Sequence, residues 1–158
     1  MNQLSVITDN VAELLVKILE FTHLRQRVLI HNVHNLNNLD FLPKDLPVEE
    51  FCNVLNRALA EHIQYHRLLL QDTDNVTFRE NGMTEITPLV DEEAKTLLRA
   101  NPDQYIELQL AKLLENSLNY KLAAELLRQK QVVIPALDKL TNEKTKAWKA
   151  QLKDIPIE

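Results

Sequence analysis

The stretch 105–130, YIELQLAKLLENSLNYKLAAELLRQK, decides the fold class of this 158-residue chain. Mostly apolar residues recur in it at alternating four- and three-residue steps, which is typical of a helix with a heptad seam. Such a seam needs a partner helix, so the stretch predicts a helical bundle or a coiled coil. The seam consists of Ile106, Leu110, Leu113, Ser117, Tyr120, Ala124 and Leu127, and a second row beside it consists of Leu114, Leu118, Leu122 and Leu126.

A partner for that seam is predicted at 10–36, near the start of the chain. This segment repeats the same steps, but it begins with apolar residues and ends with amides, and Arg25 fills the one step that lacks either. Asp9 and Asn10 suit its first turn, because their side-chain oxygens accept hydrogen bonds from unpaired backbone N–H groups. Its seam is Val11, Leu14, Ile18, Phe21, Val28, Asn32 and Asn35.

The rest of the chain is organised around these two helices. Prolines and asparagines disfavour helix after residue 36, and β-branched residues on both sides of Asn81-Gly82 predict a hairpin. We therefore expect a single elongated domain, 1–158, that is mainly α with a small β-hairpin. Its segments are a helix at 10–36, an Asn/Pro loop at 37–47, a second helix at 48–71, the hairpin at 76–87, a long helix at 91–130 that Asn101-Pro102 can interrupt, and a basic tail at 131–158 with a short last helix from Pro135.

The composition limits the classes of function that the chain can have. One glycine argues against folds that depend on tight turns or phosphate-binding loops, and one cysteine excludes an internal disulfide. The formal net charge of -5 is opposite to that of a typical nucleic-acid binder. No apolar run is long enough to span a bilayer, and we find no cleaved secretory signal at the start.

The sequence offers few candidate catalytic or metal-binding residues. His62 and His66 are four residues apart on the second helix, a spacing that can bind a metal, but no HExxH sequence surrounds them. No paired nucleophile and base and no glycine-rich phosphate loop are recognisable. We therefore expect no enzyme activity and no cofactor, and a metal-binding helical protein stays the weakest of the alternatives.

The end of the first predicted helix carries the sharpest motif. From Arg25 the chain reads RQRVLIHNVHNLNNLDFLPKDLPVEEF. This resembles the signature N-I-A-N-x-x-T-P-G-Y-K-A-R-D-L of the proximal-rod subunits of the bacterial flagellar basal body. The signature's Thr-Pro-Gly is Asn38-Leu39-Asp40 here, and Leu42 replaces its lysine after the aromatic residue. The residues that match are Asn32, Asn35, Phe41, Lys44, Asp45 and Leu46.

A second match lies on the long helix, in the expected order. The stretch 110–120, LAKLLENSLNY, resembles the family's C-terminal M-A-x-L-A-x-N-x-L-x-Y. The matching residues are Ala111, Leu113, Asn116, Leu118 and Tyr120, with Leu110 in place of the methionine.

The resemblance implies a structural protein. Rod subunits of this family pair an N-terminal with a C-terminal helix around a central export channel and transmit torque. The chain would then leave the cell through the flagellar type III apparatus, without a cleaved signal, and reside in the periplasmic part of the basal body. Its partners would be copies of itself, other rod subunits, the basal-body adaptor and the export gate. The alternative is a cytosolic helical adaptor or regulator that binds one partner helix through the same seam and an acidic surface through its basic tail.

Overall fold

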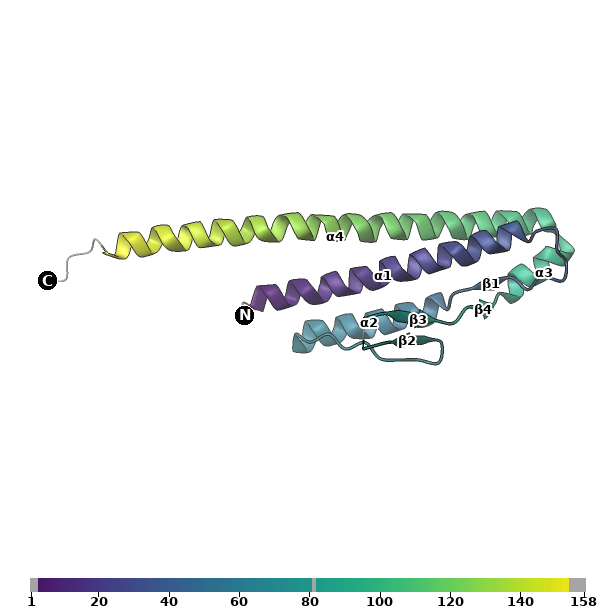
Figure 1. Ribbon diagram of the computed structural model, residues 1–158, viewed down its shortest axis with the longest axis horizontal. Helices are drawn as coiled ribbons and strands as arrows, with labels where there is room; N and C mark the ends of the chain where they lie inside the picture. The colour runs from purple at the N-terminus through teal and green to yellow at the C-terminus, as the bar shows by residue number, and fades with distance from the viewer. Residues whose placement is uncertain (1–2, 81, 154–158) are drawn as a thin grey trace.

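The computed structural model describes the backbone of residues 3–80 and 82–153, and the side chains of residues 10–80 and 82–131. The chain is mainly α-helical with short antiparallel strand pairs, as the sequence predicts. It is also elongated, because its longest helices run side by side along one axis (Figure 1). None of the helices within the described residues has an apolar stretch long enough to cross a bilayer.

Three helices form the body. α1 (Gln3–His34) lies between α4 (Pro102–Lys153) on one side and α2 (Val48–Tyr65) on the other (Figure 1). α1 and α4 are antiparallel and adjacent along most of α1, so the predicted pairing of N- and C-terminal helices is confirmed. α1 begins earlier than the predicted residue 10. It ends at His34, two residues before the predicted end at residue 36, and turns follow it.

α2 is shorter than the predicted helix at 48–71. It begins after Pro47 with Glu49 and Glu50 in its first turn, as expected for its positive dipole end. It ends at Tyr65, because His66 adopts the left-handed conformation at φ 55° and donates its N–H to the carbonyl of His62. A residue in this conformation stops a helix, so the prediction of six further helical residues is wrong.

The long helix predicted at 91–130 is two helices. α3 (Glu92–Ala100) starts at Asp91, whose side chain accepts a hydrogen bond from the Ala94 N–H. The break falls at Asn101, which precedes Pro102 and is extended at ψ 88°, as the residue before a proline prefers. α4 then continues to Lys153 without interruption. The prediction of a separate tail with a short last helix from Pro135 is therefore wrong.

Two short strand pairs flank the helices. β2 (Val76–Phe78) and β3 (Thr84–Ile86) form the predicted hairpin, with Gly82 at φ 80° in its turn. β1 (Lys44–Asp45) pairs with β4 (Leu89–Val90), so the segment predicted as an Asn/Pro loop contains a strand. This second pair ties the connection after α1 to the start of α3.

The core contains two clusters of buried apolar residues. The first holds Phe21, Leu46, Phe51 and Val76, and the rings of Phe21 and Phe51 stack with centroids 4.2 Å apart. It therefore fastens the hairpin and α2 to α1. The second cluster fastens α3 to α4 and consists of Ala94, Leu98 and Tyr105, with Leu36 and Phe41 packed against it.

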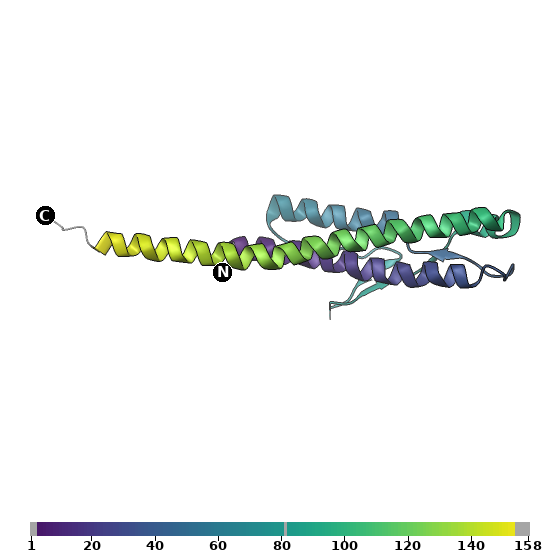
Figure 2. The same cartoon turned by 90° about the horizontal axis from the view of Figure 1, so that it is seen from above.

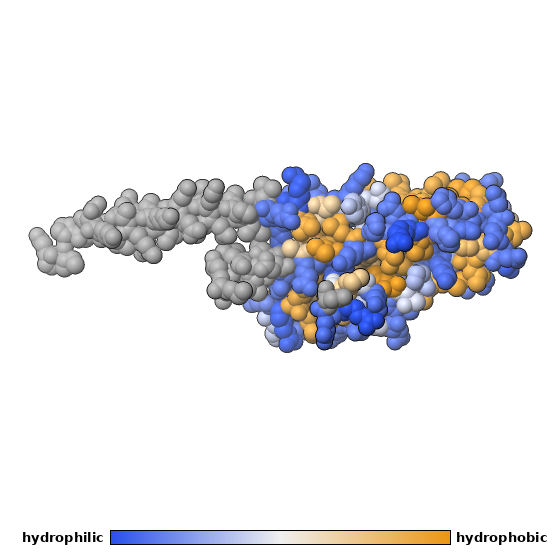
Figure 3. Space-filling model, viewed as in Figure 1, coloured by the Kyte–Doolittle hydropathy of each residue, from blue (hydrophilic) through white to orange (hydrophobic). Residues whose placement is uncertain are grey.

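α4 does not bury its predicted seam. Its buried residues are Tyr105, Gln109, Asn116 and Ala123. At about 100° per residue, this face lies roughly 70° around the helix from the predicted seam. Leu110 and Tyr120 of that seam are 54% and 46% exposed, and apolar surface reaches solvent along the upper edge formed by α4 (Figure 3). The prediction that these leucine and tyrosine residues face α1 is wrong.

Candidate functional site

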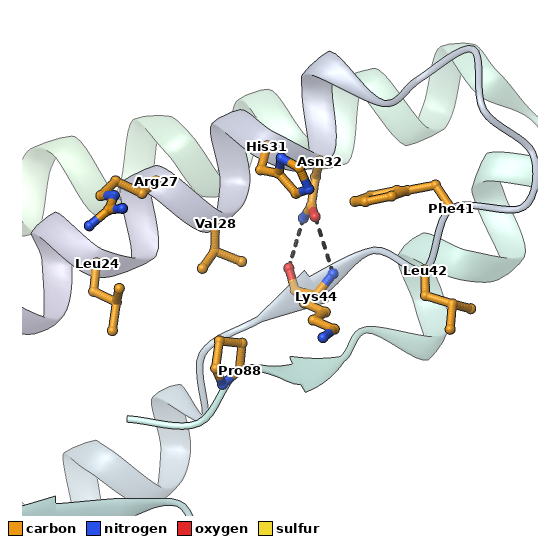
Figure 4. A pocket seen from close by; sticks show the side chains of 9 residues that line it. All are labelled: Leu24, Arg27, Val28, His31, Asn32, Phe41, Leu42, Lys44 and Pro88. Atoms are coloured by element: carbon orange, nitrogen blue, oxygen red, sulfur yellow. Dashed lines mark hydrogen bonds between the residues drawn. The ribbon is translucent and has the colours of Figure 1, made fainter. Parts of the chain in front are cut away.

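The two stretches that carry the resemblance meet between α1 and α4. Asn32 is at their centre, and its side chain is buried. Its amide nitrogen donates to the carbonyl of Lys44 at 2.7 Å, and its amide oxygen accepts from the Lys44 N–H at 3.1 Å (Figure 4). The same nitrogen donates to Gln109 Oε1 at 2.9 Å, and Tyr105 Oη donates to the carbonyl of Asn32 at 2.9 Å. Asn32 therefore joins α1, β1 and α4.

An ion-pair network lies one to two turns away on α1. Arg25 donates from Nε and Nη2 to the two carboxylate oxygens of Asp45, at 2.8 and 2.9 Å. Lys112 reaches Asp45 at 3.1 Å and Asp91 at 2.5 Å, and Arg25 also contacts Glu115 at 3.4 Å. We call the whole set the polar junction; it consists of Arg25, Asn32, Asp45, Asp91, Tyr105, Gln109, Lys112 and Asn116.

Burial and charge act in opposite directions on these groups. Burial alone would raise the pKa of Asp45, but the hydrogen bonds and charge of Arg25, followed by Lys112, outweigh it and lower that pKa below 3.8. Burial lowers the pKa values of Arg25 and Lys112, and their carboxylate partners raise them by more. All three groups therefore stay charged at neutral pH. Burial, with a contribution from the Asp91 charge, raises the pKa of Tyr105 to about 12.

Asn116 extends the junction along α4. Its amide nitrogen donates to the carbonyl of Thr22 at 2.7 Å, which fixes α4 against α1 two turns from Gln109. Within the described part of the chain, Asn116 Oδ1 and Gln109 Nε2 are buried without a hydrogen-bond partner. The junction is therefore polar throughout and nearly, but not fully, satisfied.

A hollow of about 430 Å³ lies beside the junction, between α1 and the segment that precedes β1 (Figure 4). Phe41 packs there edge-on against His31, with ring centroids 5.3 Å apart. Its lining combines apolar side chains with Arg27, His31 and Lys44 and includes no carboxylate. Neither a nucleophile with an adjacent base nor an acidic metal-ligand set lines this hollow, so it suits an apolar contact more than a reaction.

The first motif is built into this region more fully than the second. Asn32, Asp45 and Leu46 are buried or nearly so, and Lys44 takes part through its backbone. Asn35 is half-buried, and its side chain contacts the His31 carbonyl and ring. In the second motif Asn116 is buried and Leu113 is half-buried. The remaining matches are exposed on α4; they are Leu110, Ala111, Leu118 and Tyr120.

Sequence reasoning missed most of the α4 side of the junction. Tyr105, Gln109, Lys112 and Asn116 recur at steps of four, three and four residues, which is a second heptad frame next to the apolar one. That frame was visible in the sequence, but its polar residues are typical of a solvent-exposed face. Their partners lie on α1, on β1 and at the start of α3, far away along the chain.

The histidine pair does not form a metal site with other ligands. His62 is buried, and its Nδ1 lies 3.2 Å from the side-chain nitrogen of Asn10. The His66 ring is edge-on to it at 6.4 Å between centroids. Among residues 10–80 and 82–131, whose side chains the structure describes, no group of three or more histidine, cysteine, aspartate or glutamate residues is placed to hold a metal ion.

Known proteins add no relative to this description. No family model, no curated protein and no solved structure matches the chain.

Proposed function

We propose that the chain is a structural subunit of the proximal rod of a bacterial flagellar basal body, and that it self-assembles through its N- and C-terminal helices. One observation carries the proposal: the two motifs, which are far apart in the sequence, contact each other in the polar junction. Asp45 of the first motif accepts a hydrogen bond from Lys112 of the second stretch at 3.1 Å. A directional, buried contact of this kind fixes the register of the helix pair, which a repeating subunit requires.

The exposed matches support the same proposal. Leu110, Leu118 and Tyr120 match the family motif but lie on the solvent side of α4. A monomer gains nothing from exposing such a row, whereas contiguous exposed apolar surface is typical of a protein–protein contact. In a rod these side chains would pack against neighbouring subunits.

The partners and location follow from the resemblance. We expect export through the flagellar type III apparatus, residence in the periplasmic part of the basal body, and contacts with other rod subunits, the adaptor and the export gate. The protein would act through packing surfaces and would catalyse no reaction.

Deletion of the gene, followed by complementation, tests the proposal. We expect the deletion strain to lose flagella and swimming, and the wild-type gene to restore both. Leu118→Arg should fold but fail to restore rods, because it places a charge on the exposed row. Asn56→Arg is the matched control, since it adds the same charge at an exposed residue of α2, away from that row of α4. Purified basal bodies and motility are the readouts.

The exposed row also favours the cytosolic adaptor, because a single partner helix can cover it. The two functions differ in the deletion strain. Normal rods and normal swimming would reject the rod subunit and leave the adaptor, and the protein would then be found in the cytosol with one bound partner.

A further inference from the structure

An apolar groove runs along the body on one side of α1. Side chains of α1, α2 and α4 line it, and α1 lies between the other two helices in Figure 1. Its volume is about 250 Å³. The apolar side chains that line it include Leu15 and Ile18 on α1, Phe51 and Leu55 on α2, and Leu122 and Leu126 on α4.

The groove is uncovered in the described structure. Leu122 and Leu126 are 61% and 44% exposed, although they line an apolar surface. Leu59 and Ile63 lie one and two turns beyond Leu55 on α2 and are also exposed, so the apolar wall continues past the groove. The one charged residue in the lining is Arg25, whose charge is already paired with Asp45.

The same molecule has a helical segment without a neighbour. α4 continues well past the start of α1 as a single helix (Figures 1 and 2). The 22 residues 132–153 extend about 33 Å. Most helical stability in proteins comes from packing of an apolar face, so a projecting segment with such a face gains from a surface to pack on. In sequence, this segment repeats apolar residues at helical spacing; they include Val133, Leu137, Leu140 and Ala147.

The projecting segment cannot reach the groove of its own molecule. α4 is continuous from Pro102 to Lys153, and its own residues 116–126 form one wall of that groove. The segment after residue 131 therefore leads away from the groove along the same axis. An occupant with this sequence must come from another molecule.

Charge favours that pairing. Residues 132–153 contain five lysines and two acidic residues, whereas residues 1–131 contain nineteen acidic and thirteen basic residues. The wall helices carry exposed carboxylates: Glu49 on α2, and Glu115 and Glu125 on α4, which already contact Arg25 and Arg128. A basic helix with an apolar stripe thus meets an acidic body with an apolar groove.

We propose that residues 132–153 of one copy dock in the α1–α2–α4 groove of a second copy. This inference deepens the proposed self-assembly and rests on it. The donor segment and the acceptor groove are different surfaces, so each copy donates its segment to one neighbour and receives a segment from another. Contacts of this heterologous kind repeat, and here they repeat along the long axis of the molecule.

Association of the purified full-length protein is the first test. Sedimentation velocity should show concentration-dependent oligomers. The double variant Leu122→Arg/Leu126→Arg should weaken association by about tenfold or more. It removes leucine surface that the docked segment would bury, and its new charges repel the lysines of that segment. Leu39→Arg is the control, since Leu39 is 59% exposed but lies in the turn after α1, outside the groove and away from the exposed leucines of α4. A wild-type protein that stays monomeric at every concentration, or equal loss in both variants, overturns the proposal.

A cross-link identifies the contact directly. Cys52 is the one cysteine of the chain, is exposed and lines the groove. Leu137→Cys or Leu140→Cys should give a disulfide-linked dimer under mild oxidation, and the dimer should disappear when Cys52→Ser is added. Lys139→Cys, about 100° around the helix from Leu140, should cross-link less. Dimers that persist with Cys52→Ser would place the segments against each other and reject the groove as their site.

The outcomes separate this inference from the rod function. Specific cross-links in vitro together with normal flagella in the deletion strain would keep the docking and reject the rod. Lost flagella without cross-links or groove-dependent association would keep the rod and reject the docking.

Discussion

The polar junction and the apolar groove lie along the same helix pair, yet they are built from opposite chemistry. In the junction, side chains from α1, β1 and α4 are buried and their polar atoms are mostly paired. In the groove, leucines from α4 stay exposed beside a stacked pair of phenylalanines. The difference teaches that α4 changes along its length: one end is held by buried polar contacts that fix its register on α1, and the middle leaves apolar side chains exposed.

The two regions should also respond differently to substitution. Hydrogen bonds and ion pairs are directional, and removal of one partner leaves the others buried and unpaired. An apolar side chain that is already exposed contributes little to stability, so shortening it should change the free energy of unfolding only slightly. Four predictions test this contrast, from the largest expected loss of stability to the smallest.

Asp45→Ala should lower the free energy of unfolding by about 3 kcal/mol, because it leaves Arg25 buried with only a longer contact to Glu115. Urea denaturation at neutral pH measures the change. Asp40→Ala, on the exposed loop just before β1, is the control and should have almost no effect. A loss below about 1 kcal/mol for Asp45→Ala would mean that the network contributes little.

Asn32→Ala should cost about 2 kcal/mol, because the backbone groups of Lys44 and the side-chain oxygen of Gln109 lose their partner. The other asparagine of the motif is the matched control. Asn35→Ala removes bonds to His31 alone and should change stability by less than about 0.5 kcal/mol. Equal effects of the two substitutions would contradict the central place of Asn32.

Acid should reduce the contribution of Asp45 to the stability of the polar junction. The folded-state pKa of Asp45 is lower than in the unfolded chain, so its stabilising contribution is complete above about pH 4 and disappears as the pH falls through the folded value. The difference in unfolding free energy between wild type and Asp45→Asn should therefore be widest near neutrality and shrink below that pH. A difference that stays constant down to pH 2 would show that the Asp45 charge is not what stabilises the junction.

Leu114→Ser should have the smallest effect on stability, within about 0.5 kcal/mol, because the side chain is exposed on α4. Thermal unfolding followed by circular dichroism would detect a larger change. A marked loss would indicate that this leucine packs inside the monomer, and the outer row of α4 would then no longer be free for subunit contacts.

The helices were predictable because their signals are local. Heptad spacing located α1 and α4, Pro47 with two glutamates located the start of α2, and Asn81-Gly82 located the hairpin. The end of α2 was not predictable, because the left-handed His66 carries no local sequence signal comparable to a glycine. The same holds for the pairing of β1 with β4, which depends on contacts between distant segments.

The packed face of α4 was mispredicted for a physical reason. A periodicity argument assigns apolar residues to the interior, and here the interior face is occupied by Gln109, Lys112 and Asn116. Their burial is favourable only because Asn32, Asp45 and Thr22 supply partners. No single segment of sequence contains both halves of these bonds, so the junction emerges only in the folded chain.

The placement of the junction contacts has a mechanical consequence. Arg25, Asn32 and the Thr22 carbonyl lie at different turns of α1, and each is bound across to α4 or β1. A force that slides α1 along α4 therefore loads all of these bonds together, rather than opening them one after another. An apolar seam would permit slippage by a turn with little change in contact, whereas this helix pair resists shear as a single unit.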